Sequence, residues 1–148
     1  MKAQFKICLL AILFFLNGFI NAQEKANKKV IDTLAYVAKF EKNKDKYIGK
    51  RFGLLIKDMI QMQPKMAKST FNEDVSNPMT STSFIFSDKN FDTEGEPVLI
   101  VKWRADDMPT DPIQFAEESN SYRFTAGQKN MLENKIIKDI AVVNKWWN

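Results

Sequence analysis

The fold class of this chain is decided by the stretch Pro97-Val98-Leu99-Ile100-Val101-Lys102-Trp103-Arg104. The stretch is rich in β-branched and aromatic residues, which is typical of a β-strand. Residues 98–101 are apolar without alternation, which indicates a central strand covered on both faces by helices or loops. A second strand is predicted at residues 83–86, with residues 88–96 as the hairpin loop between the two. Trp103 is expected to lie in the core.

Two helices are predicted before these strands. Over residues 27–42, apolar side chains recur at steps of three and four, which places them on one face of a helix. The polar residues 41–46 are expected to form a loop. From Tyr47 onward, two adjacent apolar rows form the stripe of a second helix. Pro64 ends this helix, because proline cannot continue a helix interior.

Further strands are predicted on either side of the central pair. A short strand is expected at residues 66–71 and another around Tyr122 and Phe124. Residues 140–143 are β-branched and apolar, which indicates a terminal strand.

A C-terminal helix is predicted between these last two strands. Thr125 and Gln128 have the spacing of a capping box, so we expect the helix to begin there and to continue to about Lys138. In order, the elements predict one α+β domain over residues 23–148. It contains two N-terminal helices, a mainly antiparallel sheet, a C-terminal helix and a terminal strand.

Residues 1–22 have the pattern of a secretory signal peptide. Basic residues precede an apolar run at residues 7–16, and Ala22 supplies a small residue at the expected cleavage point before Gln23. The run is shorter than the about 20 apolar residues of a membrane span. We therefore expect a periplasmic or secreted protein with no transmembrane span in its mature chain.

The absence of certain side chains limits the chemistry that the mature chain can perform. The chain contains no histidine, and its one cysteine, Cys8, lies within the expected signal peptide. Ser-His-Asp and Cys-His catalysis and histidine-ligated zinc sites are therefore excluded. The five glycines are scattered singly and form no phosphate-binding loop. These observations favour a non-enzymatic domain that needs neither a cofactor nor a metal.

One segment resembles a known group of proteins. Tyr47-Ile48-Gly49-Lys50, followed by Leu54-Leu55 and Asp58-Met59, is similar to a segment of small, uncharacterised exported proteins of Bacteroidota-type bacteria. Those proteins have a similar leader ending in Ala-Gln, then helices, strands and a final Ile-x-x-Ile-x-Val. The resemblance spans most of the chain, and it implies export and fold type without implying an activity.

The hairpin loop contains a partial calcium-binding pattern. Asp88, Asn90 and Asp92 alternate as the oxygen ligands of a calcium loop do. However, Thr93 occupies the glycine position of that loop, and Leu99 falls where its bidentate glutamate belongs. A solvated hairpin loop is therefore favoured over a calcium-stabilised module.

Adjacent carboxylates suggest an alternative function. Glu117 and Glu118, together with the loop aspartates, could supply the two carboxyl groups of a small hydrolase acting on cell-wall or polysaccharide material. That chemistry needs two carboxyl groups about 5–9 Å apart across a cleft.

A basic stretch supplies the predicted partner-binding residues. Residues 23–68 hold 12 basic and 5 acidic side chains, whereas residues 69–148 hold 8 and 13. Basic groups mixed with aromatic ones suit nucleic acid, but an exported protein more often meets a protein, a glycan or an anionic surface. The simpler interpretation is a solvated helix end and loop whose aromatic residues belong to the core. The predicted contact residues are Lys44, Lys46, Tyr47, Lys50 and Arg51.

Overall fold

The computed structural model describes residues 32–72 and 78–144 of the chain. The expected signal peptide and residues 23–31 lie outside the described residues. The described part is an α+β fold, as predicted, and none of its helices is long and apolar enough to cross a membrane. Its helices are α2 (Thr33–Lys42), the 3-10 helix η1 (Lys44–Lys46), α3 (Phe52–Asp58), α4 (Asp111–Ser119) and α5 (Ala126–Leu132). Its strands are β1 (Met66–Phe71), β2 (Met79–Ile85), β3 (Pro97–Trp103) and β4 (Ile137–Asn144).

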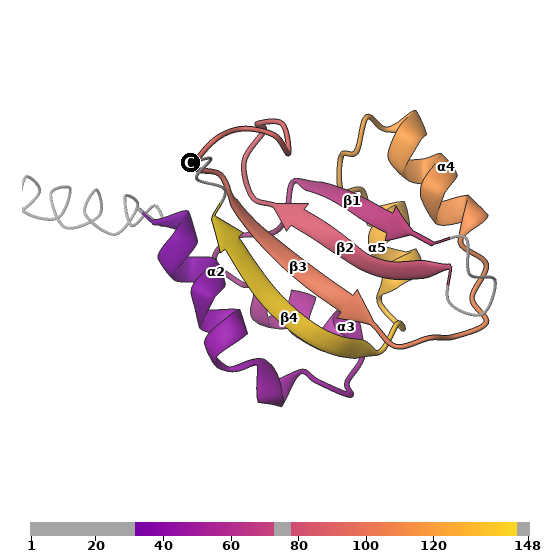
Figure 1. Ribbon diagram of the computed structural model, residues 1–148, viewed down its shortest axis with the longest axis horizontal. Coiled ribbons are helices and arrows are strands. Elements are labelled where there is room, and N and C mark those ends of the chain that lie inside the picture. The colour runs from indigo at the N-terminus through magenta and orange to yellow at the C-terminus, as the bar shows by residue number, and fades with distance from the viewer. Residues whose placement is uncertain (1–31, 73–77, 145–148) are drawn as a thin grey trace, which may run out of the picture. The chain divides into compact units, whose positions relative to one another are not determined.

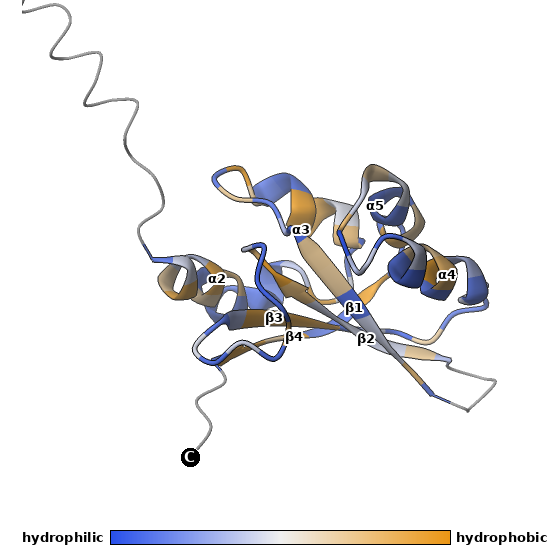
Figure 2. Ribbon diagram, turned by 90° about the horizontal axis from the view of Figure 1, so that it is seen from above, coloured by the Kyte–Doolittle hydropathy of each residue, from blue (hydrophilic) through white to orange (hydrophobic). Residues whose placement is uncertain are grey.

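The four strands form one antiparallel sheet in the order β1-β2-β3-β4 (Figure 1). The central position predicted for β3 is confirmed, because Leu99 lies opposite Phe84 of β2 and opposite Val142 of β4. Strand β4 joins the sheet only after the chain has formed α4 and α5. Seen from above, α3, α4 and α5 lie on the same side of the sheet (Figure 2).

The core lies between the sheet and these helices. Phe52 of α3 stacks on Phe84 at 5.2 Å between ring centroids and meets Trp103 edge-on at 5.3 Å. Trp103 is 1% exposed, so its predicted place in the core is confirmed. The apolar stripe predicted for the second helix is likewise buried, through Phe52, Leu55, Ile56 and Met59.

The second helix is shorter than predicted. At its start, Gly49 has a φ of 75°, and its amide donates to the carbonyl of Ile137, so this segment pairs with β4 before the helix begins at Phe52. At its end, the side-chain amide of Gln63 donates to the carbonyls of Ile56 and Met59. The carbonyl of Ile56 also accepts from the amide of Met59, so these bonds satisfy carbonyls that are left over where the helix stops at Asp58.

The segment after β3 differs from the prediction in two ways. Helix α4 was not predicted, and in place of a strand around Tyr122 and Phe124 there is a single bridge between Met66 and Arg123. The helix is hard to recognise because only Ile113 and Glu117 of its nine residues are buried. The predicted N-cap of the next helix is confirmed, since Thr125 accepts from the amide of Gln128, but the side chain of Gln128 donates to Glu117 and does not complete the capping box. Helix α5 ends at Leu132 and not near Lys138.

The predicted coverage of β3 by helices or loops is complete on one face and partial on the other. Leu99, Val101 and Trp103 point toward the helices and are fully buried. On the other face, Val98 is buried beside the 88–96 loop, whereas Ile100 is half-buried. A continuous apolar run therefore does not require helices on both sides when a loop covers one end of the strand.

Candidate functional site

The two faces of the sheet differ in character. Side chains alternate between faces along a strand, so pairing across the sheet produces two adjacent rows. On the helix side, Ser69, Thr82, Val101 and Ile140 pair in sequence, and all four are buried. On the other side, Lys68, Ser83, Ile100 and Ala141 pair in sequence, and all four are at least partly exposed. We call this second side the open face.

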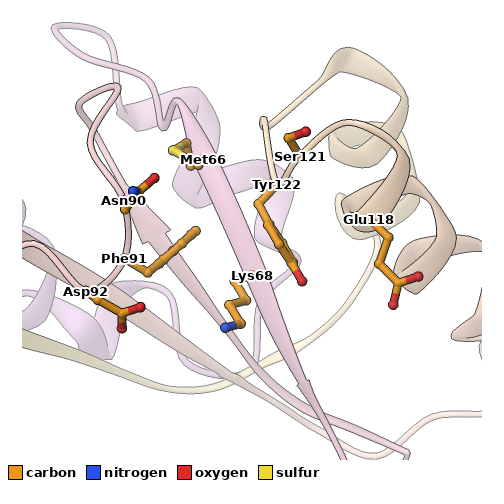
Figure 3. A pocket seen from close by; sticks show the side chains of 8 residues that line it. All are labelled: Met66, Lys68, Asn90, Phe91, Asp92, Glu118, Ser121 and Tyr122. Carbon is orange, nitrogen blue, oxygen red and sulfur yellow. The ribbon is translucent and has the colours of Figure 1, made fainter.

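A hollow of about 450 Å³ lies where the 88–96 loop approaches β1 and the turn after α4 (Figure 3). A second hollow of about 160 Å³ shares Lys68, Phe91 and Asp92 with the first and extends onto the open face toward Ile100 and Val143. The two hollows together are referred to as the groove. The first hollow is lined by Met66, Lys68, Asn90, Phe91, Asp92, Glu118, Ser121 and Tyr122.

Two aromatic rings and an ammonium group meet in the groove. The rings of Phe91 and Tyr122 lie edge to face, with their centroids 6.4 Å apart. The Nζ atom of Lys68 lies 5.6 Å from the centroid of the Tyr122 ring, within the range of a cation–π contact. All three side chains point into the same space (Figure 3). This part of the groove therefore combines an apolar surface with an ammonium group, and the carboxylates of Asp92 and Glu118 line the same hollow.

The backbone that presents Tyr122 is strained. Ser121 and Tyr122 have φ values of 51° and 61°, which residues other than glycine rarely adopt. The amide of Ser121 donates to the carbonyl of Glu118, and the amide of Tyr122 donates to that of Glu117 at 2.7 Å. These two bonds form a Schellman motif at the end of α4, with Ser121 where glycine is usual. The carbonyl of Tyr122 in turn accepts from the amide of Ala67 on β1 at 2.9 Å, so the backbone of Tyr122 is held by both α4 and β1.

Ion pairs hold the loop on the other side of the groove. Asp88 pairs with Lys65 at 2.6 Å and lies 3.9 Å from Arg123, while Lys89 lies 3.4 Å from the buried Glu96. The hydrogen bond from Lys65, together with its positive charge, lowers the pKa of Asp88. The charge of the first residue of the suspected calcium pattern is thus balanced by basic groups. Within residues 32–72 and 78–144, no group of three or more acidic, histidine or cysteine residues is placed to hold a metal.

A buried carboxylate lies behind the groove. Glu117 of α4 is 2% exposed, and burial raises its pKa, although hydrogen bonds to Ser69 and Gln128 act in the opposite direction. Its Oε2 accepts from the amide of Ser69 at 2.9 Å. Its Oε1 accepts from the hydroxyl of Ser69 at 2.6 Å and from the side-chain amide of Gln128 at 2.9 Å. Glu117 is therefore enclosed by protein donors and cannot contact a substrate.

The hydrogen bonds continue from Ser69 into the sheet. Ser69 Oγ lies 2.8 Å from Thr82 Oγ1, which accepts from the indole nitrogen of Trp103 at 3.0 Å. Ser69 donates its hydroxyl hydrogen to Glu117, so in the bond between the two hydroxyl groups it accepts from Thr82. Each group in this chain of hydrogen bonds therefore donates to the next one, from the indole to the carboxylate. The network connects α4 to three strands.

The predicted pair Glu117 and Glu118 is separated by this arrangement. Glu117 is buried in the network, whereas Glu118 is exposed and lines the groove. Consecutive helical residues point about 100° apart, so one side chain can enter the core while the next faces solvent. The two carboxyl groups do not face each other across a cleft.

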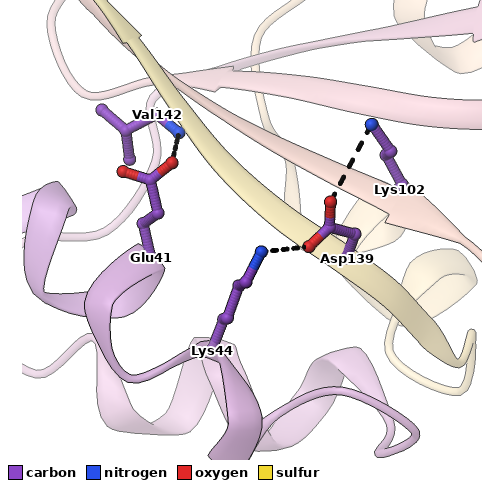
Figure 4. A network of polar contacts seen from close by, with 5 residues as sticks. All are labelled: Glu41, Lys44, Lys102, Asp139 and Val142. Carbon is purple, nitrogen blue, oxygen red and sulfur yellow. Dashed lines mark hydrogen bonds and ion pairs between the residues drawn. The ribbon is translucent and has the colours of Figure 1, made fainter.

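The first part of the predicted partner-binding stretch covers the edge of β4 (Figure 4). Lys44 donates to Asp139 at 2.8 Å, and Lys102 lies 3.8 Å from the other oxygen of the same carboxylate. The hydrogen bond from Lys44 lowers the pKa of Asp139. Glu41 accepts from the backbone amide of Val142 at 3.1 Å, as Glu117 does from Ser69 on the opposite edge.

The rest of this stretch contacts α3 and the start of β4. Lys46 and Tyr47 both donate to one oxygen of Asp58, at 2.6 and 2.9 Å. Tyr47 is only 4% exposed and so belongs to the core, while Lys50 and Arg51 are exposed. None of the five predicted residues lines the groove. Their role in partner binding remains a prediction.

The groove residues Lys68, Phe91 and Tyr122 were not predicted as a site. One signal was present, because Phe91 is the only apolar residue in the polar loop 88–96. An aromatic residue in such a position needs either a core contact or a functional reason. Tyr122 gave no such signal, because its neighbours suggested a strand.

Comparison of the chain with family models, with curated proteins and with solved structures gives no match. The function considered below therefore rests on the geometry of the described residues.

Proposed function

We propose that the protein is an exported, non-enzymatic binding domain whose ligand occupies the groove. The observation that carries this proposal is the position of Tyr122. A bulky residue is held in left-handed backbone by bonds to α4 and β1, and its ring lines an exposed hollow together with Phe91. Strained backbone of this kind costs about 1–3 kcal/mol per residue and is concentrated at functional sites.

Rigid walls on both sides support a binding role. The Lys65–Asp88 and Lys89–Glu96 pairs hold the loop, and the sheet forms the floor. A site that is already ordered loses little conformational entropy when its ligand binds. We therefore expect the groove to take a ligand without a large rearrangement.

The alternative, a carboxylate-dependent hydrolase, receives less support. Such an enzyme needs an accessible acid whose pKa is raised. The pKa of Glu117 is raised, but this residue is 2% exposed and both its oxygens are bonded to protein donors. Glu118 and Asp92 line the groove, where they can bind a ligand by accepting hydrogen bonds.

Export is the second part of the proposal, and it rests on the N-terminal sequence pattern. Intact-mass measurement of the native protein tests it directly. We expect a chain that begins at Gln23. A cytosolic species that retains Met1 would show that this part is wrong.

Binding at the groove is tested with protein recovered from the periplasm of a bacterial host. A low-molecular-weight and oligosaccharide extract of the source culture is expected to raise the melting temperature of the wild-type protein, because a ligand of the native state stabilises it. The rise should be lost in Tyr122→Ala and retained in Phe115→Ala, since Phe115 is an exposed aromatic residue outside the groove. An equal rise in both variants would contradict the groove as the site.

A further inference from the structure

We infer that the groove binds a neutral oligosaccharide chain, with one sugar ring packed against Tyr122. The inference rests on the proposed function and adds the chemical class of the ligand. It follows from the hydrogen-bonding groups, the aromatic surface and the charge of the groove, together with the state of the sheet edges.

The hydrogen-bonding groups of the groove are mixed. Lys68 is a donor, Asp92 and Glu118 are acceptors, and Asn90 and Ser121 can act as both. All five side chains are exposed, and all five line the same hollow. Sugar hydroxyl groups also donate and accept, so a chain of sugars matches this set better than a ligand that only donates or only accepts.

The aromatic surface suits the apolar face of a sugar ring. Tyr122 and Phe91 are half-buried and meet edge to face, so part of each ring remains open to the groove. Both rings contribute apolar contact area, and the hydroxyl group of Tyr122 adds a polar group. The second hollow continues over Ile100 and Val143, which leaves room for further residues of a chain.

The charges of the groove are mixed. Two carboxylates, Asp92 and Glu118, line the first hollow together with one ammonium group, that of Lys68. An anionic polymer would meet the carboxylates, and a basic one would meet the ammonium group, whose Nζ lies 5.6 Å from the centroid of the Tyr122 ring, so neither sign of charge is matched throughout the groove. A neutral ligand needs no such match.

A peptide added as an extra strand is disfavoured by the sheet edges. On β1, the outward amides of Ala67 and Ser69 donate to Tyr122 and Glu117. On β4, the amide of Val142 donates to Glu41, and Ile137 exchanges bonds with residues 49–50. Strand addition needs unpaired edge groups, and the amides at these positions are already paired.

Native electrophoresis in gels that contain a polysaccharide tests the inference. The gels contain mixed-linkage β-glucan, xyloglucan or galactomannan as neutral polymers, polygalacturonate as an acidic one, or a soluble chitosan as a basic one. We expect at least one neutral polymer to retard the wild-type protein, and neither charged polymer to do so. Tyr122→Ala should weaken the retardation about tenfold, which corresponds to the loss of one good ring contact.

Matched variants make the result specific. Asp92→Asn should weaken retardation, whereas Asp107→Asn and Phe115→Ala, which alter exposed residues outside the groove, should leave it unchanged. Phe91→Ala, in the loop, provides a second test if Tyr122→Ala fails to fold. Equal retardation of wild type and both aromatic variants overturns the inference, as does retardation by charged polymers alone.

The two proposals can fail separately. If the culture extract stabilises the wild-type protein but not Tyr122→Ala, and no neutral polymer retards the protein, the ligand class is wrong and the binding function stands. If neither the extract nor any polymer acts through Tyr122, both proposals are wrong.

Discussion

The carboxylate of Glu117 accepts hydrogen bonds from both the backbone amide and the hydroxyl of Ser69, at 2.9 and 2.6 Å. This pair joins α4 to the edge strand β1 from inside the core. Glu118 follows Glu117 in the chain, and Lys68 precedes Ser69. Both of these neighbours consequently face the groove. The buried pair therefore positions two charged groups of the site without contacting a ligand.

Removal of the Ser69 hydroxyl should destabilise the protein. Ser69→Ala breaks the connection between Thr82 and Glu117 and leaves buried groups without partners, which costs about 1–3 kcal/mol. Urea denaturation measures this loss. Ser83→Ala on the open face is the matched control and should change the unfolding free energy by less than about 0.5 kcal/mol. Equal effects of the two variants would show that the network adds nothing to stability.

The stability of the protein should depend on the charge of Glu117. Burial raises the pKa of Glu117 in the folded state. Its contribution to the free energy of unfolding is therefore complete below the unfolded pKa of about 4.3 and is lost as pH rises through the folded pKa. In Glu117→Gln this loss is absent, so the stability of the variant relative to wild type should increase with pH over that window. Gln128 can adapt, because its Oε1 accepts no hydrogen bond in the described structure and can turn toward a donor.

Urea titrations between about pH 4 and pH 7 measure this difference, since the window begins near the unfolded pKa. Glu118→Gln, which alters an exposed carboxylate, is the control and should give a smaller dependence. A Glu117→Gln difference that stays constant, or that shrinks as pH rises, would rule out a raised pKa at this position.

The strain at the end of α4 can be relieved at one position. Ser121→Gly places glycine where the Schellman motif favours it and should stabilise the protein by about 0.5–1 kcal/mol. Ala116→Gly, in the interior of the helix, should instead destabilise it by about 1 kcal/mol. Thermal denaturation compares the two variants. A loss of stability in Ser121→Gly would mean that the hydroxyl group matters more than the backbone.

The edge of β4 should weaken when Glu41 is removed. Glu41→Ala leaves the amide of Val142 without its acceptor, and we expect a loss of about 0.5–1.5 kcal/mol. Asp45→Ala, at an exposed position of η1, is the control. Amide hydrogen exchange at Val142 should accelerate in Glu41→Ala only, and unchanged exchange there would argue against this contact.

Much of the fold could be predicted from the sequence, in the segments where local patterns are strong. The apolar run of β3 and the cap at Thr125 depend on near neighbours, and both were predicted correctly. Helix α4 was missed because its second buried residue is Glu117, whose burial depends on donors from β1 and α5. A glutamate is normally expected at an exposed position, so the sequence of this helix shows no apolar face.

The site could not be predicted from the sequence, because it depends on contacts between distant segments. Lys68, Phe91 and Tyr122 come from a strand, a loop and a turn that only the folded sheet brings together. The same limit applies to the basic stretch, where Lys44 pairs with Asp139 over a separation of 95 residues. The charge of the basic stretch can be read from the sequence, whereas the partner of Lys44 cannot.

The central claim is that the ligand binds in the groove, and amide chemical-shift mapping of the exported protein tests it most directly. Addition of an oligosaccharide cut from the polymer that retards the protein should shift the amide signals of residues 66–70, 88–92 and 118–123. The signals of residues 44–51, which include the predicted basic contact residues, should not move. Shifts confined to residues 44–51, with the groove signals unchanged, would contradict the account.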